Sequence, residues 1–140
     1  MNEVEILEAM NKQCKDTLME TLDIKFTAVG KDFVEAQMPV TPKVHQPDGV
    51  LHGGATVALA ETVGSVASFI FADQKSSIVR GIEISANHVK GIASGVVTAR
   101  AEVLHKGRTT QLWDIKIRNE EKELISVVKL TTITLPKVQK

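Results

Sequence analysis

The sequence predicts an α+β domain in which one antiparallel sheet wraps around a long central helix. Two observations indicate this class. Residues 53–72 form a run of apolar and small residues, enough for about five helical turns. The segments on both sides of this run alternate apolar and polar residues with a period of two, as half-buried strands do. A sheet with one apolar face needs a partner, and a helix that is apolar all round needs cover on most sides.

The chain begins with a predicted helical lid over residues 1–22. Asn2 is a favourable N-cap, and the residues after it are acidic, which the helix dipole favours in a first turn. Ile6, Leu7 and Met10 form its apolar face, and the lid is expected to pack over the core. Leu18 and Leu22 indicate a short second helical piece. Cys14 is the single cysteine, so no internal disulfide can form, and we expect it to be buried or half-buried in a protein of a reducing compartment.

Two alternating segments follow, at residues 24–28 and 34–40, with a turn at residues 30–32. They predict a β-hairpin with one apolar and one solvated face. Pro39 and Pro42 end this hairpin, and a loop then leads into the central helix.

Four further strands are predicted after the helix. They lie within residues 78–90, 97–103, 113–117 and 124–135. Because consecutive antiparallel strands usually lie side by side, we expect a four-strand meander. The sequence has no repeat, linker or low-complexity block, so residues 1–140 are expected to form a single domain.

The central run is also long enough to cross a bilayer. Glu61 stands near its midpoint, where a charge costs about 2.5–3.5 kcal/mol on insertion scales, and the alternating strands need this helix as a partner. The sequence therefore favours a buried helix over a membrane span. The first residues are acidic where a signal peptide is basic, so we expect a cytoplasmic protein.

The charge balance argues against polyanionic partners. Basic and acidic residues number 17 each, which gives a formal net charge of zero. We therefore expect no nucleic acid and no anionic membrane as a partner.

The chemistry is expected at the start of the central helix and at its one charged residue. Gly53 and Gly54 leave the first free N–H groups of the helix accessible, and the dipole there favours a developing negative charge, as an oxyanion site requires. Glu61 is a carboxylate among alanines and valines, which is costly unless the group is paired or chemically used. The structural alternatives are two glycines that ease a loop into tight packing, and a buried ion pair of Glu61 with Arg80.

The spacing of these two features predicts a site shared between chains. Glu61 lies eight residues after Gly53, so about 12 Å of helix separates them. One reacting carbonyl cannot lie about 3 Å from both. If both act on one substrate, they belong to two chains whose helices run antiparallel about a two-fold axis. Ser65, one turn beyond Glu61, could hold a water or a substrate oxygen, or bond to its own helix.

Other motifs are sparse. The four histidines show no HxH or HExxH spacing, so we expect no metal site. The sequence contains no Walker loop, GxGxxG fingerprint or nucleophile elbow. Residues 87–90 and 105–110 join cations to hydrogen-bond donors at strand ends, which suits a phosphate-bearing ligand but is also common in solvated hairpin ends.

Residues 45–68, HQPDGVLHGGATVALAETVGSVAS, resemble the hotdog-fold acyl-CoA thioesterases. The nearest branch is that of the 1,4-dihydroxy-2-naphthoyl-CoA, phenylacetyl-CoA and Arthrobacter-type 4-hydroxybenzoyl-CoA thioesterases. The likeness continues in LDIKF, VEAQMPV, GIEISANHVK, LHKGRTTQLWDIKI and VVKLTT. The resemblance implies the hotdog fold, an acyl-CoA substrate and a homodimer that forms the active site, usually doubled to a homotetramer. No separate cofactor is implied, because CoA enters as part of the substrate.

By this resemblance, Glu61 is the nucleophile or the general base that activates water. The Gly53 N–H of the neighbouring chain polarises the thioester carbonyl, aided by Gln46. His52 shapes the loop, and Ser65 orients the acyl group or the water. Binding of CoA falls to Gly81, His88, Val89, Lys90, Gly91, His105, Lys106, Gly107, Arg108, Thr109 and Thr110.

The sequence departs from the family pattern at Asp48 and Val50, and by one residue before Gly81, which bears on acyl specificity more than on the reaction. Aryl and medium-chain acyl groups both stay open, with the lid and three helix residues expected to line their pocket (Val57, Val63, Ser68). Two other functions stay open as well. A hotdog-fold dehydratase or hydratase needs a histidine acting jointly with the acid, and a non-catalytic acyl-CoA sensor binds its ligand without hydrolysis.

Overall fold

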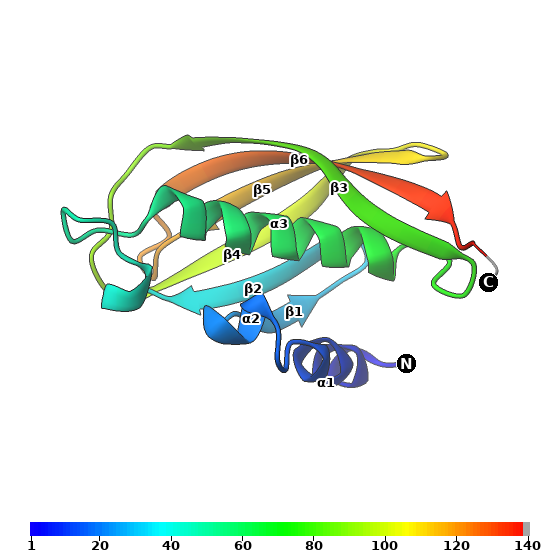
Figure 1. The fold of residues 1–140 in the computed structure, drawn as a ribbon, viewed down its shortest axis with the longest axis horizontal. Coiled ribbons are helices and arrows are strands. Elements are labelled where there is room, and N and C mark those ends of the chain that lie inside the picture. The colour runs from blue at the N-terminus through cyan, green and yellow to red at the C-terminus, as the bar shows by residue number, and fades with distance from the viewer. Residues whose placement is uncertain (139–140) are drawn as a thin grey trace.

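In the computed structural model, which describes residues 1–138, six antiparallel strands curve around one long helix, α3 (Figure 1). The predicted α+β architecture is confirmed. The elements are α1 (Glu3–Gln13), α2 (Leu18–Thr21), β1 (Lys25–Val29), β2 (Phe33–Pro39), η1 (Pro42–Val44), α3 (Gly53–Ile70), β3 (Ser77–His88), β4 (Val96–Lys106), β5 (Thr110–Arg118) and β6 (Leu124–Pro136).

The strand order β1-β2-β4-β5-β6-β3 corrects the predicted four-strand meander. Strands β4, β5 and β6 do form a meander, but β3 pairs with β6 at the far edge of the sheet, and β4 pairs with β2. The physical reason lies in the connection between β3 and β4. It is not a tight turn but a longer segment that packs against the loop before α3, where the Leu51 N–H donates to the carbonyl of Ile92 (2.8 Å).

The core lies between the sheet and α3. Inward-facing residues of β4 and β5 are fully or almost fully buried and alternate with more exposed neighbours, as the period of two predicts (Val97, Ala99, Ala101, Trp113, Ile115, Ile117). On α3 the buried residues form one face, which includes Leu59, Val63 and Ala67. The opposite face is only half-buried in the single chain, so the expectation of burial on most sides is met on the sheet side alone.

The N-terminal helices lie beside β1, at the edge of the sheet (Figure 1). Asn2 caps α1 as predicted: its Oδ1 accepts from the Glu5 N–H (2.9 Å), and the Glu5 carboxylate accepts from the Asn2 N–H (3.1 Å). Cys14 is buried, as expected, and its thiol donates to the Met10 carbonyl.

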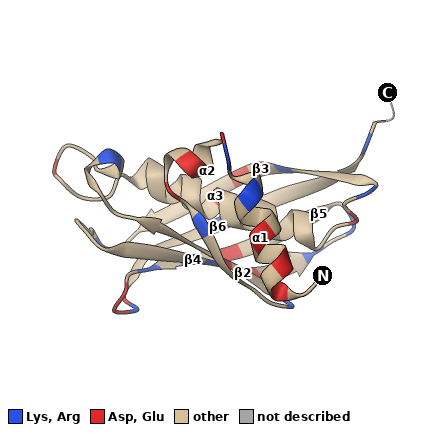
Figure 2. Cartoon of the chain, turned by 90° about the horizontal axis from the view of Figure 1, so that it is seen from below, with Lys and Arg blue, Asp and Glu red and all other residues tan. Residues whose placement is uncertain are grey.

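By length and composition, α3 could cross a membrane. It is nevertheless the helix around which the sheet wraps, and core helices of this kind meet the same criteria. Acidic and basic residues are interspersed over α1 and the neighbouring strands on the side that Figure 2 shows, in keeping with the balanced charge of the sequence.

Candidate active site

The start of α3 presents an accessible N–H group. His52 is the N-cap: its Nδ1 accepts from the Gly54 N–H (2.8 Å), and its carbonyl accepts from the N–H groups of Ala55 and Thr56. Because Nδ1 is an acceptor, it carries no proton. Within residues 1–138 the Gly53 N–H donates to no acceptor, so it is the free donor at the positive end of the helix dipole.

A cleft of about 290 Å³ surrounds this helix start and gathers several residues that the sequence singles out. Its lining includes Gln46 and Gly53 together with the end of β3 and the loop after it (His88, Val89, Lys90, Gly91). Gln46 accepts the Asp48 N–H through Oε1, which leaves its amide NH₂ group available. Lys90 pairs with Glu123, and this ion pair lowers the pKa of the Glu123 carboxyl.

His88 lies directly over Gly53. A Cβ atom at position 53 would stand 2.8 Å from Nε2 of His88, so a side chain there would displace the imidazole. The Ser126 hydroxyl donates to the Asn87 carbonyl (3.2 Å) and also contacts Nδ1 of His88. The contact with Ser126 orients the imidazole so that its Nε2 edge faces the helix start. His88 was expected to bind CoA; its position over Gly53 is a contact that the sequence did not predict.

Glu61 lies on the half-buried face of α3 against strand β3. A Cβ atom at Gly81 would stand 2.7 Å from Oε2 of Glu61, so the glycine is what allows the carboxylate to approach the strand. The pairing of β3 with β6 shifts register between Gly81 and Glu83, and such bulges often occur beside active sites. Gly81 was expected to bind CoA; its place in the fold is next to the carboxylate.

The ion pair of Glu61 with Arg80, the structural alternative to a reacting carboxylate, does not form. The Arg80 guanidinium donates to the Val79 carbonyl (2.9 Å) and is exposed to solvent. In the described part of the chain, the Glu61 carboxylate has neither a hydrogen bond nor an ion pair. The carboxylate is therefore not held by a structural pair within these residues and is free to contact a bound molecule.

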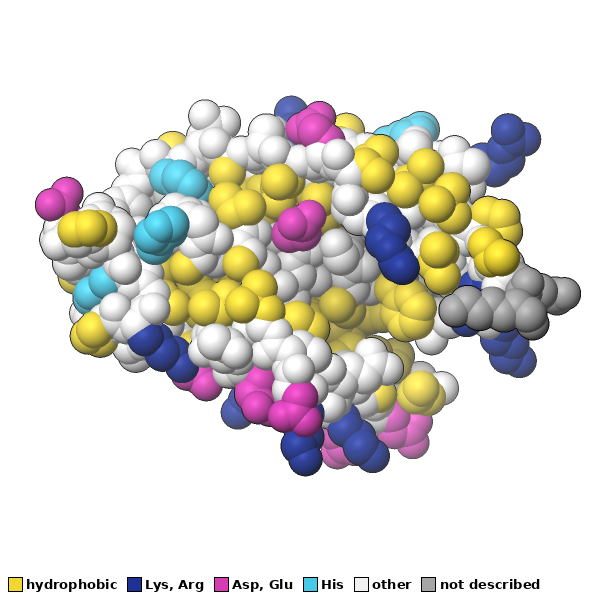
Figure 3. Space-filling view, viewed as in Figure 1, with side chains coloured by type: hydrophobic (Ala, Val, Ile, Leu, Met, Phe, Trp, Pro, Cys, Tyr) yellow, Lys and Arg dark blue, Asp and Glu magenta, His cyan; other side chains and the backbone are white. Residues whose placement is uncertain are grey.

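Beyond Glu61, the same side of α3 leads to an apolar groove. Ser65 follows one turn later, half-buried, and the groove of about 350 Å³ opens between the end of α3 and α1. The lining is mostly apolar, from both helices (Ile6, Ala9, Met10, Val66, Phe69, Ile70). Figure 3 shows hydrophobic side chains gathered over α3 on this face and a recess beside them. Val63 and Ser68, which were expected to line an acyl pocket, are instead buried against the sheet.

The second segment expected to bind CoA, residues 105–110, lies at the other end of α3. Lys106, Gly107 and Arg108 line a cleft of about 210 Å³ beside Phe71, whose carbonyl accepts from Lys106 Nζ (3.2 Å). The remaining members of the segment, His105, Thr109 and Thr110, are exposed in the same hairpin. Within one chain, α3 therefore separates the two segments expected to bind CoA.

A buried hydrogen-bond network anchors this hairpin to the core. Nε1–H of Trp113 donates to the Ser68 hydroxyl (2.6 Å), which contacts the Thr132 hydroxyl (2.6 Å), and Thr132 donates to Oε1 of Gln111 (3.1 Å). Trp113 also stacks on Phe71, with ring centroids 5.9 Å apart. The residues of this hydrogen-bond network come from α3, β5 and β6, so no local sequence signal could reveal the network.

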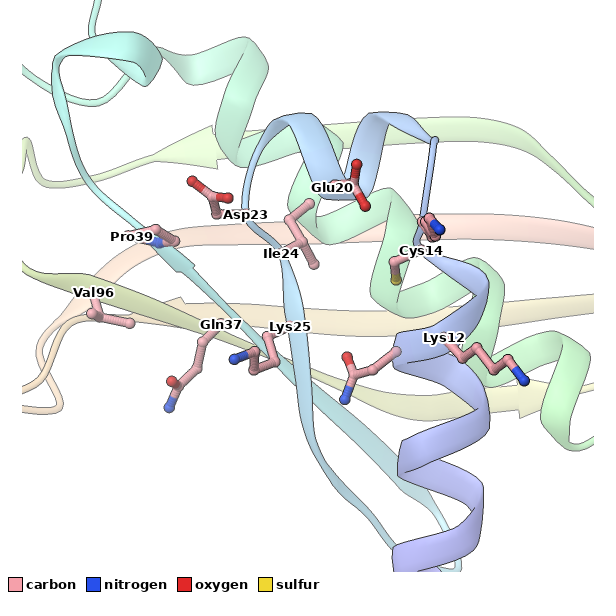
Figure 4. A pocket seen from close by; sticks show the side chains of 11 residues that line it. Lys12, Cys14, Glu20, Asp23, Ile24, Lys25, Gln37, Pro39 and Val96 are labelled. Atoms are coloured by element: carbon pink, nitrogen blue, oxygen red, sulfur yellow. The ribbon is translucent and has the colours of Figure 1, made fainter.

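A hollow of about 610 Å³ lies elsewhere, and its lining side chains come from α1, α2, the connections that follow these helices, and strands β1, β2 and β4 (Figure 4). Cys14 lines it, but burial raises the pKa of the thiol, which disfavours the reactive thiolate. The hollow contains neither Glu61 nor Gly53. Among the described residues, no group of three or more histidine, cysteine or acidic residues is placed to hold a metal ion.

Comparison with known proteins gives one family. Residues 48–126 match the family model of the Thioesterase superfamily. The 1,4-dihydroxy-2-naphthoyl-CoA hydrolase of Escherichia coli K12 is 42% identical over 129 residues, which cover 92% of this chain and 94% of the relative. The proofreading thioesterase EntH of Cronobacter turicensis is also 42% identical over 129 residues, with 92% and 93% covered.

Solved structures of thioesterases resemble this chain over nearly its whole length. A glutamine-to-alanine variant of a Pseudomonas aeruginosa thioesterase superposes with a TM-score of 0.92 at 40% identity, over 94% of both chains. A thioesterase of Haemophilus influenzae gives a TM-score of 0.91 at 43% identity, over 95% of this chain and 92% of the other. The family model spans more than half of the chain, and these relatives match it almost end to end. The chain therefore belongs to the thioesterase superfamily and is a thioester hydrolase with the hotdog fold.

Proposed function

We propose that this enzyme hydrolyses acyl-CoA thioesters to a free acid and CoA. Glu61 of one chain and the Gly53 N–H of a second chain act on the same carbonyl group. The observation that carries the proposal is the Glu61 carboxylate, which is half-buried and unpartnered within the described residues and is accommodated by Gly81. The name of the Escherichia coli relative, a CoA thioester hydrolase, favours the same substrate class.

The geometry within one chain favours a dimeric site. Gly53 and Glu61 lie on one continuous helix, so about 12 Å separates them along its axis. Strand β3 is an edge strand of 12 residues, and exposed edges of this length are usually covered. Antiparallel pairing of two β3 edges about a two-fold axis would also set two α3 helices antiparallel. The start of one helix would then face the middle of the other.

The same pairing would bring residues 87–90 of one chain close to residues 105–110 of the other. The cleft beside Gly53, which contains Lys90, lies at the start of α3, whereas Lys106 and Arg108 lie at its end. In a pair of antiparallel helices, the start of one lies near the end of the other. Both segments could then bind the phosphates of one CoA molecule. We propose a homodimer as the active unit, doubled to a homotetramer as the family resemblance implies.

The chemistry follows from these positions. The Gly53 N–H, at the positive end of α3, stabilises the negative charge that develops on the thioester oxygen, and the free amide of Gln46 adds a second donor. Glu61 either attacks the carbonyl carbon, forming an anhydride that water then cleaves, or takes a proton from the attacking water. In both routes the C–S bond breaks, and the CoA thiolate leaves and is protonated. CoA is part of the substrate, so the scheme includes no separate cofactor or metal.

The apolar groove is the proposed acyl site. Glu61, Ser65 and Phe69 follow one another at intervals of four residues, so they lie along the same side of α3. An acyl group whose carbonyl lies at Glu61 would extend past Ser65 into the groove between α3 and α1. The groove's apolar lining suits an aryl or medium-chain group. A CoA ester as substrate and a single unpaired cysteine fit a cytoplasmic enzyme.

The reaction is tested by thiol release, measured with Ellman's reagent, from aryl and aliphatic acyl-CoA esters. Wild-type enzyme should turn over at least one of them, and Glu61→Ala should lose nearly all turnover while its fold is kept. A Glu61→Ala variant with full activity would refute the role of this carboxylate. Binding of CoA esters by wild-type protein without any thiol release would instead favour a sensor.

The oxyanion donor has a matched pair of variants. Gly53→Pro removes the N–H but suits the first position of a helix, and the extended backbone of His52 (φ −66°, ψ 130°) is compatible with a following proline. Gly53→Ala adds the same Cβ contact with His88 but keeps the N–H. The loss of kcat should be about 10²–10³-fold larger for proline than for alanine. Equal losses would show that the N–H is not the donor.

A two-chain site is tested by mixing inactive subunits. Glu61→Ala and Gly53→Pro subunits, unfolded and refolded together, should regain activity, because one of the two sites in a mixed dimer keeps both native groups. Each variant refolded alone is the control. Absence of recovery, with mixed dimers demonstrated, would contradict the shared site.

A further inference from the structure

Asn11, on α1, binds the edge of the sheet through both ends of its side-chain amide. Its Nδ2–H donates to the Phe26 carbonyl (3.0 Å), and its Oδ1 accepts from the Phe26 N–H (2.8 Å). Phe26 belongs to β1, an edge strand, and its register with β2 shifts between Phe26 and Ala28. The amide thus gives β1 the donor and acceptor that a further strand would supply. An amide is suited to this role because it offers both groups in one plane.

Met10, which precedes Asn11 on α1, faces the apolar groove between α1 and α3. Met10 is buried (8% exposed) and lines the groove together with Ile6 and Ala9 of the same helix. Helix α1 packs against β1, and the groove separates it from the end of α3. The position of this groove wall relative to α3 is therefore fixed by how α1 is attached to β1. Among the described residues, the Asn11–Phe26 pair supplies the side-chain hydrogen bonds of this attachment, beside the apolar packing of α1 on the core.

We propose that the Asn11–Phe26 pair is a specificity-determining clamp, which sets the width of the groove and thereby the acyl groups that the enzyme accepts. This inference rests on the proposed function, in which the groove receives the acyl group. Asn11 touches neither the thioester nor CoA, so it is a positioning residue. A short acyl group ends near Glu61 and Ser65 and does not need the α1 wall, whereas a long or aryl group contacts it.

The test compares kcat/KM for acetyl-CoA, octanoyl-CoA and benzoyl-CoA in wild type, Asn11→Ala and Asn11→Gln, with Tm measured for each. Asn11→Ala removes both hydrogen bonds. Asn11→Gln keeps both groups but lengthens the side chain by one methylene, which moves α1 outward. We expect the octanoyl-to-acetyl or benzoyl-to-acetyl ratio to change by about tenfold or more, mainly through KM, the size of effect that one methylene has in an apolar pocket. Acetyl-CoA hydrolysis should stay at the wild-type rate.

Asn119→Ala is the matched control. Asn119 also makes two hydrogen bonds through its amide, both with Glu123 in the β5–β6 turn, away from the groove. Its loss should change all three esters by the same factor. Wild-type ratios in both Asn11 variants, whatever their Tm, would overturn the clamp and leave the proposed function standing. If wild-type enzyme releases thiol from no acyl-CoA, the proposed function fails and the clamp fails with it. If Asn11→Ala does not fold, Asn11→Gln decides between these outcomes.

Discussion

Replacing Gly81 by alanine should separate activity from stability. The added Cβ would lie 2.7 Å from Oε2 of Glu61 and 3.5 Å from Cδ1 of Leu130, and the second distance is an ordinary contact. The conflict therefore falls on the carboxylate, which has to move by about 0.7 Å to reach a normal separation of about 3.4 Å. Glu61 is the end of a flexible side chain, so this movement costs little folding energy.

The catalytic effect should be much larger. Misplacement of a reacting group by about 1 Å can cost about 10²-fold in rate. We expect Gly81→Ala to lower kcat by about 10- to 100-fold and to leave Tm close to the wild-type value. The assay is thiol release from the best acyl-CoA ester, with thermal unfolding measured in parallel. Ser85→Ala, on the same strand and exposed, is the control and should match wild type in both.

Two results would contradict this reasoning. Full activity in Gly81→Ala would mean that the carboxylate does not act from its position beside β3. A clear fall in Tm together with the loss of kcat would mean that Gly81 is needed for the strand itself and not for the approach of Glu61.

Three further outcomes can be checked. Gly64→Ala should lower Tm, because its Cβ would lie 2.5 Å from Leu130 and 2.9 Å from Ile115 in the core, and overpacking of about 1–3 kcal/mol exceeds the gain of about 1 kcal/mol in helix propensity. Arg108→Ala should raise KM for an acyl-CoA but not for the matching acyl-pantetheine, which lacks the nucleotide phosphates. Burial raises the pKa of the Cys14 thiol, so the folded state holds that proton more tightly than the unfolded state. This stabilisation is present below the unfolded pKa and is lost as pH rises through the folded pKa, so Cys14→Ala should reduce the alkaline fall in urea midpoint.

The sequence predicted local features of the fold well because they depend on local periodicity. Alternation in β4 and β5 gave the buried side of each strand, and the capping residue Asn2 gave the start of α1. The partner of β3 could not be predicted, because strand pairing depends on contacts between residues far apart in the chain. Likewise, an α3 that is apolar all round does not reveal which face meets the sheet, so Val63 and Ser68 were placed in the wrong environment.

For the candidate site, too, local features could be predicted and contacts between distant segments could not. Gly53 and Glu61 were predicted as site residues because their spacing and residue types are visible within one helix, and their roles stay predictions. The contact of Glu61 with Gly81 and the position of His88 over Gly53 join segments that only the fold brings together. The structural alternative, a pair of Glu61 with Arg80, could not be decided from the sequence, because alternation along a strand does not fix the direction of a long side chain at its exposed positions.

Trp113 also makes the molecule its own optical reporter. The chain contains one tryptophan and no tyrosine, so its near-ultraviolet absorption and emission arise almost wholly from this indole. The indole is 1% exposed, its N–H is bound to Ser68 and its ring stacks on Phe71, beside the cleft that contains Lys106 and Arg108. A nucleotide that enters this cleft would alter the emission without any added label. A stopped-flow fluorimeter could thus time the arrival of CoA separately from the release of its thiol.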